Sequence, residues 1–318
     1  MKAWRSWVAL LDRREPADAL ALMRILTGLG AVHAIASVIV YDAVELLYFD
    51  AREGGYLALG PGSWLVRLLG GPTPSIVWLF VLLSLAGAVA VTIGFGGRIA
   101  PLITAQAMLA LKSINGLQGS YGAITANALW LLVLARSTET LSVDCRLRSG
   151  RWTSEEPVPA WPEVVAVVQL AVIYFCNGLY KISAHWTPGG DMSAIYYILQ
   201  QPTWQRSSML WVAWIYPLTQ AATAITWLFE LSWPVVLLSL YYRRTASRGG
   251  RLRTLMNKID LRKVYLAIAL ALHGLITVAL DVGPFMVATL AFYPCLFSPD
   301  ELRACLARVR RARWEPTQ

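Results

Sequence analysis

The chain has 318 residues, of which 57% are hydrophobic and 15% are charged, and its formal net charge is +9. Soluble globular domains average roughly 45–50% apolar and about 25% charged residues, so the composition argues against a soluble protein and for one embedded in a membrane. The positive charge alone would suit a nucleic-acid-binding protein, but its distribution along the chain, described below, argues against that class.

Apolar segments follow one another along the chain, and we expect about eight transmembrane helices. The clearest is residues 76–95, a run of uncharged residues long enough, as a helix, to cross a hydrocarbon core about 30 Å thick. Several of the others are short or interrupted by Pro or Gly. The predicted spans are 19–41, 76–95, 99–111, 120–135, 162–182, 217–240, 264–280 and 284–297.

The segment 191–200 is too short to span a membrane, and we expect it to form a short re-entrant or interfacial helix. The predicted spans leave no room for a soluble module. The predicted fold class is therefore all-α: a polytopic integral-membrane helical bundle that forms a single transmembrane domain over residues 1–318, with no separate soluble domain.

The basic residues are distributed unevenly between the segments that join the spans. With the N-terminus inside, most of the 28 lysine and arginine residues fall on the inner side. This asymmetry follows the positive-inside rule and predicts a multi-pass protein of the cell membrane with both termini in the cytoplasm. We expect no cleavable signal peptide. The basic run 243–263 is interpreted as a topology anchor that touches anionic lipid of the bilayer, not as a nucleic-acid site.

No cofactor or metal motif is visible. The four cysteines form no CxxC pair and the three histidines are scattered, so no metal site is predicted. The sequence has no P-loop, no GxGxxG after a strand and no GxSxG. The glycines of Gly94–Gly97 are explained by a turn between two spans.

Predicted spans contain the ionisable side chains Arg24, Glu230, His273 and Lys181, and a charge costs at least about 2.5 kcal/mol at the bilayer centre. Arg24 is near the inner end of its span and can serve structure by snorkelling or by pairing with a carboxylate. Glu230 could be the partner of Arg24 or of His273, or a carrier of protons. His273 is either a satisfied interior histidine or a site residue. We expect Arg24, Glu230 and His273 to support a site from neighbouring helices.

The most informative charge is Lys181, in the stretch YFCNGLYKISAHWTPGG (residues 174–190). Helical spacing puts Tyr174, Asn177 and Lys181 on one face of the span. Gly178 on the same side would let a ligand or a helix approach closely. Together with Trp186 in the following turn, these residues suggest a pocket open to the outer side of the membrane. The alternative is that Lys181 is an anchor at the membrane interface.

This stretch resembles the signature of the HTTM (horizontally transferred transmembrane) family, which includes the membrane domain of the vitamin K-dependent gamma-glutamyl carboxylase. Other parts of the chain are similar to further family motifs in the same order. They are ALMRILTG (21–28) with Arg24, GFGGRIAP (94–101) with Arg98, LSVDC (141–145) and the region 270–301.

The resemblance implies an activity and roles for two residues. In the carboxylase, the lysine of this signature deprotonates vitamin K hydroquinone and the tyrosine seven residues earlier lines the quinone site. By position these are Lys181, the candidate catalytic base, and Tyr174. A quinol hydroxyl should titrate like a phenol, with a pKa of ~10. An amine that burial keeps neutral could accept that proton. No cofactor follows from the residues alone. If the chain is an enzyme, the resemblance implies a reduced quinone (vitamin K hydroquinone or menaquinol) with O2 and, for carboxylation, CO2.

Two departures from the carboxylase limit what carries over. The carboxylase has a helper histidine on the loop after the third span, whereas this loop reads LKSINGLQGSYG (111–122). It offers Asn115, Gln118 and Tyr121 as candidate substrate-binding residues instead. The large lumenal domain of the carboxylase is not represented in these residues either, so carboxylation does not follow from the resemblance.

In length the chain is more similar to the SdpB-like bacterial branch of the family, whose members take part in maturing a secreted peptide toxin. We therefore keep a second hypothesis, a non-catalytic accessory component for maturation or export of a secreted peptide. In either case a peptide substrate or a partner subunit is the expected protein partner. A third and weaker hypothesis is a transporter.

Overall fold

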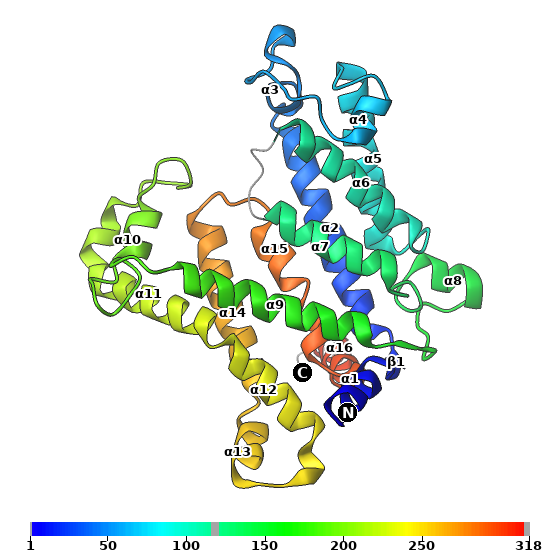
Figure 1. The fold of residues 1–318 in the computed structure, drawn as a ribbon, viewed down its shortest axis with the longest axis vertical. Coiled ribbons are helices and arrows are strands. Elements are labelled where there is room, and N and C mark those ends of the chain that lie inside the picture. Colours follow the sequence, from blue (N-terminus) through cyan, green and yellow to red (C-terminus); the bar gives the residue numbers. More distant parts are fainter. Residues whose placement is uncertain (1, 116–120, 315–318) are drawn as a thin grey trace. The chain divides into compact units, whose positions relative to one another are not determined.

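The computed structural model describes residues 2–115 and 121–314, and its regular secondary structure is almost entirely helical (Figure 1). In this part of the chain the strands are β1 (Arg14–Pro16) and β2 (Pro157–Pro159), which pair antiparallel with Glu15 opposite Val158. The predicted all-α class is therefore confirmed.

Among the described residues, four helices are long and apolar enough to cross a membrane. They are α2 (Asp18–Val40), α5 (Pro74–Ile93), α9 (Trp161–Tyr180) and the run Arg251–Ala279, which contains α13 (Arg251–Ile259) and α14 (Leu261–Ala279). A fifth arises if the bent pair Leu210–Leu231 and Trp233–Arg244 counts as one span.

The remaining predicted spans form shorter apolar helices: α6 (Ile99–Ile114), α7 (Tyr121–Leu134), and α15 (Phe285–Leu290) followed by η4 (Tyr293–Leu296). Each is shorter than the roughly 20 residues that a perpendicular crossing needs. The predicted apolar segments thus appear as helices, but length and composition support four or five crossings, and the expected eight are not confirmed.

The predicted span 217–240 is not one helix. It consists of α11 (Tyr216–Leu231) and α12 (Trp233–Arg244), bent by 49°. The physical reason is Pro234 in the first turn of α12, because proline lacks an amide hydrogen and its ring clashes with the carbonyl four residues earlier, here that of Glu230. The bend leaves Glu230 next to the end of α11.

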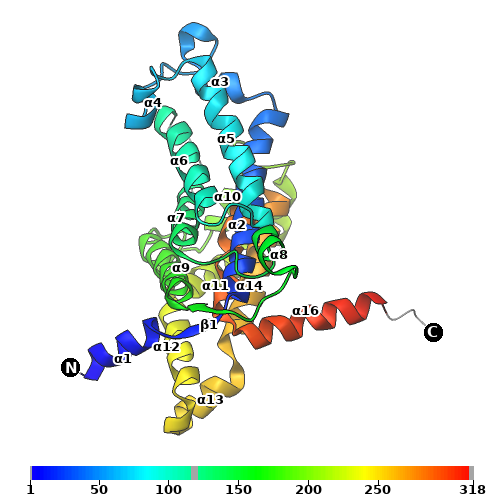
Figure 2. The same ribbon diagram turned by 90° about the vertical axis from the view of Figure 1, so that its right-hand side faces the viewer.

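Contacts within the chain define two compact units, which we describe separately. The first unit comprises residues 1–166 and 283–318, and the second comprises residues 167–282. In the first unit α2 packs against α5, α7 and α15, and α5 runs beside α6 (Figures 1 and 2). The fully buried side chains Val77, Val81 and Leu111 lie in its core.

The smaller elements of the first unit are α1 (Lys2–Leu11), α3 (Val44–Tyr48), η1 (Ala51–Glu53), α4 (Trp64–Leu68), α8 (Val143–Ser149) and α16 (Pro299–Trp314). Those of the second unit are α10 (Ala194–Leu199), η2 (Leu210–Ile215) and η3 (Ala246–Arg248). The short helix expected near 191–200 is α10.

Arg24 joins three separate parts of the first unit. Its side chain is 2% exposed, and its guanidinium donates to the carbonyls of Val91 (2.7 Å) and Thr92 (2.9 Å) at the end of α5. It also donates to the carbonyls of Ser137 (3.2 Å) and Leu141 (2.6 Å), just before α8. These bonds satisfy carbonyls that a helix end and an irregular loop leave without partners, so Arg24 has a structural role.

Asp144 in α8 stabilises the turn that follows α5. Its carboxylate accepts hydrogen bonds from the amides of Gly96 (3.1 Å) and Gly97 (2.7 Å). Gly94 takes the left-handed conformation that ends α5. The segments ALMRILTG, GFGGRIAP and LSVDC therefore meet at one place in the first unit, and the predicted glycine turn is present.

Candidate functional site

Lys181 and Glu230 form an ion pair in the second unit. Lys181 directly follows α9, and its ammonium donates to Oε2 of Glu230, the second-last residue of α11. The Lys181 side chain is 21% exposed and that of Glu230 is 10% exposed. Arg24 and His273 were considered as partners of Glu230, but the ion pair of Glu230 in the structure is with Lys181.

Gly178 allows the two helices to approach closely enough for this pair. A β-carbon at Gly178 would lie 3.0 Å from the amide nitrogen of Leu231 and 3.1 Å from Cβ of Glu230. Contacts this short are not tolerated without movement of one helix. Gly178 therefore has the role expected for it with respect to a neighbouring helix, and Lys181, three residues later, is brought beside Glu230.

The indole of Trp186 lies on another side of the Lys181 ammonium. The Nζ atom is 4.8 Å from the centre of the Trp186 ring, a cation–π distance. Trp186 is held in a turn in which its amide donates to the carbonyl of Ser183 at 2.9 Å. The ammonium is thus flanked by a carboxylate and an aromatic face, while part of it stays open to its surroundings.

An aromatic cluster lies one to two helical turns from Lys181 along α9. Tyr174 stacks on Trp233, with ring centres 4.9 Å apart, and makes an edge contact with Phe229 at 5.1 Å. Its hydroxyl is 2.6 Å from Nε2 of His273 in α14, and both side chains are 5% exposed. Tyr174 and Lys181 therefore contact the same bent segment of the chain, α11 and α12, and His273 contacts Tyr174 directly.

Asn177 does not join this face, because its side chain is exposed. At about 100° per residue it lies roughly 60° to one side of Tyr174, whereas Gly178 lies roughly 40° to the other side. The contact with α11 is on the side of Gly178. The helical spacing therefore placed Tyr174 and Lys181 on the face that contacts α11 and α12, whereas Asn177 lies beside that face.

The candidates from the loop after α6 belong to the first unit. Asn115 is buried, and its amide donates to the carbonyl of Leu47 at 2.5 Å. The ring of Tyr121 lies against Gly283. Gln118 lies outside the described residues. The contacts described for Asn115 and Tyr121 are within the first unit, and a part in substrate binding stays a prediction.

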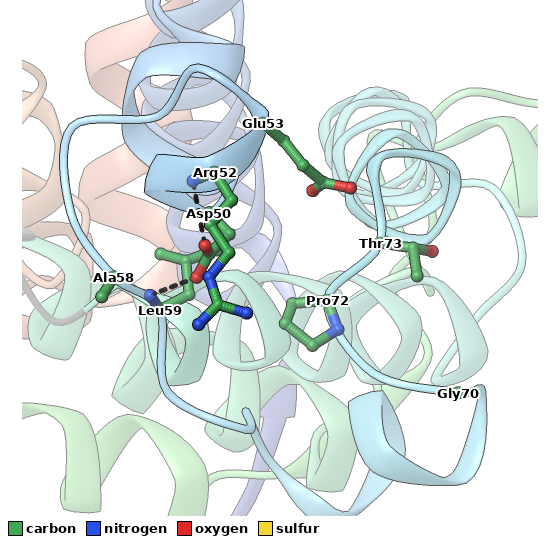
Figure 3. A pocket seen from close by; sticks show the side chains of 8 residues that line it. All are labelled: Asp50, Arg52, Glu53, Ala58, Leu59, Gly70, Pro72 and Thr73. Carbon is green, nitrogen blue, oxygen red and sulfur yellow. Dashed lines mark hydrogen bonds between the residues drawn. The ribbon is translucent and has the colours of Figure 1, made fainter.

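A pocket of about 550 Å³ opens in the first unit, between the segments that follow α3 and α4 (Figure 3). The sequence does not indicate this pocket, because its lining comes from loops rich in Gly and Pro, which are common in turns without a site. The Asp50 carboxylate at its wall accepts from the amides of Arg52 and Leu59, both at 3.0 Å, which lowers the pKa of Asp50. The lining residues are Asp50, Arg52, Glu53, Ala58, Leu59, Gly70, Pro72 and Thr73.

His185, Asp191 and Ser193 have the composition of a hydrolase triad but not its geometry. Ser193 Oγ (2.7 Å) and Asp191 Oδ1 (3.2 Å) both approach Nδ1 of His185, whereas a triad needs them on opposite ring nitrogens. Ser193 is also fully buried. The hydroxyl of Ser193 donates to Asp191 at 2.7 Å and lowers the pKa of that carboxyl. The cluster holds the turn before α10 in place.

In residues 2–115 and 121–314, no group of three or more His, Cys, Asp or Glu side chains is placed to hold a metal ion. The arrangement around Lys181 instead offers proton chemistry, because an amine and a carboxylate are in direct contact there.

Comparison with known proteins identifies one family. Residues 13–259 match the model of the HTTM domain, so the match covers most of the chain and includes the segments around Arg24, Asp144, Lys181 and Glu230. Neither a curated protein nor a solved structure matches the chain.

Proposed function

This chain belongs to the HTTM domain family, and we propose that it is an integral-membrane enzyme in which Lys181 accepts a proton from a weakly acidic substrate. The observation that supports the proposal is the direct contact between Lys181 and Glu230, two ionisable groups at adjoining ends of apolar helices. Ionisable groups in such positions are costly and are candidates for function.

The pair supplies the base without creating a net charge. Away from water the ammonium and the carboxylate both lose hydration, which raises the free energy of the charged pair. The neutral pair, amine and carboxylic acid, is then closer to it in free energy. Transfer of one proton from Nζ of Lys181 to Oε2 of Glu230 leaves a lone pair on Nζ. That lone pair then takes a proton from the substrate, and the resulting ammonium stabilises the substrate anion.

The substrate class that fits best is a reduced quinone, such as vitamin K hydroquinone or menaquinol. Its hydroxyl is a weak acid of pKa ~10, within reach of an amine base. Its flat apolar ring suits the aromatic surroundings that the buried cluster of Tyr174, Phe229 and Trp233 provides next to Glu230. When bound, the quinol supplies an oxygen anion that reacts with O2. Tyr174 and His273 orient the ring, and Trp186 holds the Lys181 side chain.

The expected location is the cell membrane, with Lys181 on the outer side. The support for this orientation is the uneven distribution of Lys and Arg, which predicts cytoplasmic termini. A substrate dissolved in the bilayer would reach Lys181 laterally, and O2 partitions readily into the same region.

The proposal is tested with the purified chain in lipid nanodiscs, supplied with vitamin K hydroquinone or menaquinol and O2. Oxygen consumption and quinone epoxide are measured. Lys181→Met should lower the rate on the order of 10²-fold or more, as expected for loss of a general base. Lys263→Met is the matched control, because Lys263 is 71% exposed and pairs with Asp260 instead of Glu230, and its rate should equal that of the wild type.

Two results contradict the proposal. One is an unchanged rate in Lys181→Met at equal expression and thermal stability. The other is the absence of quinol-dependent turnover in the wild type with either quinol, which would favour the accessory role in peptide maturation.

A further inference from the structure

Helix α13 has one side covered by α12. The two helices are joined through η3 and lie side by side (Figures 1 and 2). Met256 is buried between them, and the Asn257 amide donates to the carbonyl of Tyr242 at 3.3 Å. The guanidinium of Arg253 lies 4.9 Å from the centre of the Tyr242 ring. Arg253, Met256 and Asn257 therefore define the inner side of α13.

An adjoining side of α13 is an exposed apolar ridge. The ridge consists of three large apolar side chains that are about half exposed: Leu252 (56%), Leu255 (53%) and Ile259 (50%). Met256, in the same helix of nine residues, is buried. At about 100° per residue the three fall within a sector of roughly 60°. Arg251 and Lys258, both exposed, border that sector on one side. The helix is thus amphipathic on its exposed surface, apolar in the middle and basic at one edge.

The depth of α13 follows from α14. The 19 residues of α14 are about 28 Å long at 1.5 Å per residue, close to the thickness of a hydrocarbon core of about 30 Å. Asp260 separates the two helices in a left-handed conformation, with φ 48°. Its carboxylate attracts Arg262 (2.7 Å), Lys263 (3.3 Å) and Arg243 (3.8 Å). We expect a cluster of charges such as this one where the hydrocarbon ends, and α13 then begins at headgroup depth.

The charge of this region is strongly one-sided. Asp260 is the only acidic residue in the segment 243–263, in which Lys and Arg recur throughout, and Asp260 already has three cationic neighbours. A partner for the exposed face of α13 must therefore be anionic as well as able to receive three apolar side chains. A leaflet rich in anionic phospholipid has both properties.

We propose that α13 docks onto anionic phospholipid. Leu252, Leu255 and Ile259 enter the boundary between headgroups and acyl chains, and Arg251 and Lys258 bind lipid phosphates. The site is independent of Lys181 and of quinol chemistry. It gives the protein a dependence on the lipid composition of one leaflet.

The experiment measures the depth of single positions in the full-length chain. The background carries Cys176→Ala and Cys305→Ser, and Leu255→Cys or Thr254→Cys is labelled with an environment-sensitive fluorophore. Thr254 is the matched control, because it is also exposed but lies about 130° from the centre of the ridge. Nanodiscs of phosphatidylcholine with or without phosphatidylglycerol carry lipids spin-labelled near the headgroup, which quench the fluorophore at short range.

With phosphatidylglycerol present, the label at 255 should be quenched several-fold more strongly than the label at 254, and its emission should shift to the blue. The difference should shrink in phosphatidylcholine alone. It should also shrink when Arg251→Gln and Lys258→Gln are introduced, in chains with unchanged helicity and thermal stability.

Three results overturn the proposal. Equal quenching at 254 and 255 shows that the ridge does not face lipid. Quenching that does not respond to phosphatidylglycerol shows that headgroup charge is not recognised. Protection of position 255 that depends on protein concentration and not on lipid shows that a second copy of the chain covers the ridge.

Discussion

Gly178 and Leu231 are in such close contact that a β-carbon at position 178 would lie 3.0 Å from the Leu231 amide nitrogen. This contact sets the separation of α9 and α11, and the separation in turn brings Lys181 to Glu230. The proposed proton chemistry of Lys181, one turn further along, therefore depends on the absence of a side chain at position 178.

Gly178→Ala is expected to destabilise the protein by about 1–3 kcal/mol, because the added methyl group forces the end of α11 away. Gly274→Ala is the matched control, since no atom lies within 4 Å of a β-carbon at Gly274. Thermal unfolding in detergent should show a lower midpoint for the first variant and no loss for the second. Equal midpoints would show that α9 and α11 are not closely packed at this point.

Tyr174→Phe is expected to lower the free energy of unfolding by about 1–2 kcal/mol, because it removes the hydroxyl that lies 2.6 Å from Nε2 of His273. The ring stays stacked on Trp233 in this variant. Tyr174→Leu should cost about 0.5–1.5 kcal/mol more, since the stack is also lost. Tyr180→Phe, on the same helix and 84% exposed, serves as the control and should be neutral. A Tyr174→Phe variant as stable as Tyr180→Phe would argue against a bond that matters.

Arg24→Lys is expected to destabilise the first unit by at least about 2 kcal/mol, because a single ammonium cannot reach carbonyls on both α5 and the segment before α8. The exposed Arg98 provides the control, and Arg98→Lys should be neutral. The measurement is hydrogen exchange of the amides of residues 91–97 and 137–145. Unchanged protection in Arg24→Lys would contradict the structural role assigned to this arginine.

The turn before α10 should depend on pH through Asp191. The hydroxyl of Ser193 lowers the folded pKa of Asp191 below its ordinary value of about 3.9. The carboxylate therefore stabilises the turn at pH values above about 4, and the contribution is lost as the pH falls through the lower folded pKa. Asp191→Asn should reduce hydrogen-exchange protection of residues 185–195 at pH 5–7, and the difference should disappear in acid. Glu156→Gln should show no such difference, and a difference for Asp191→Asn that grows in acid would have the wrong sign.

The sequence was most informative about elements that depend on local pattern. Long apolar runs predicted α2, α5 and α9 to within a few residues, since a membrane span is a property of consecutive residues. The bend at Ser232 was missed, although Pro234 gave a direct signal for it. The short helices α6, α7 and α15 show that apolar character alone does not fix the number of crossings.

The candidate site was predictable only in part, because its contacts join residues far apart in the chain. Position on one helical face placed Tyr174, Gly178 and Lys181 together, but no local pattern shows that Glu230 lies opposite them. Arg24 illustrates a different limit. Its hydrogen-bond partners are backbone carbonyls, which leave no trace in residue types, so the sequence could not identify them. Family resemblance suggested the role that we propose for Lys181, which geometry alone could not name.

The central claim, that the Lys181 amine is a base, is tested most directly by chemical rescue. Lys181→Ala removes the amine and leaves space beside Glu230, and the 21% exposure of the native side chain indicates a path for a small molecule. Quinol-dependent oxygen consumption by this variant in nanodiscs is measured with a series of small primary amines of different basicity. We predict that the amines restore turnover and that the rescued rate rises with the basicity of the amine. A variant that is as active as the wild type without any amine, or an inactive one that no amine restores although it is folded, would contradict the account.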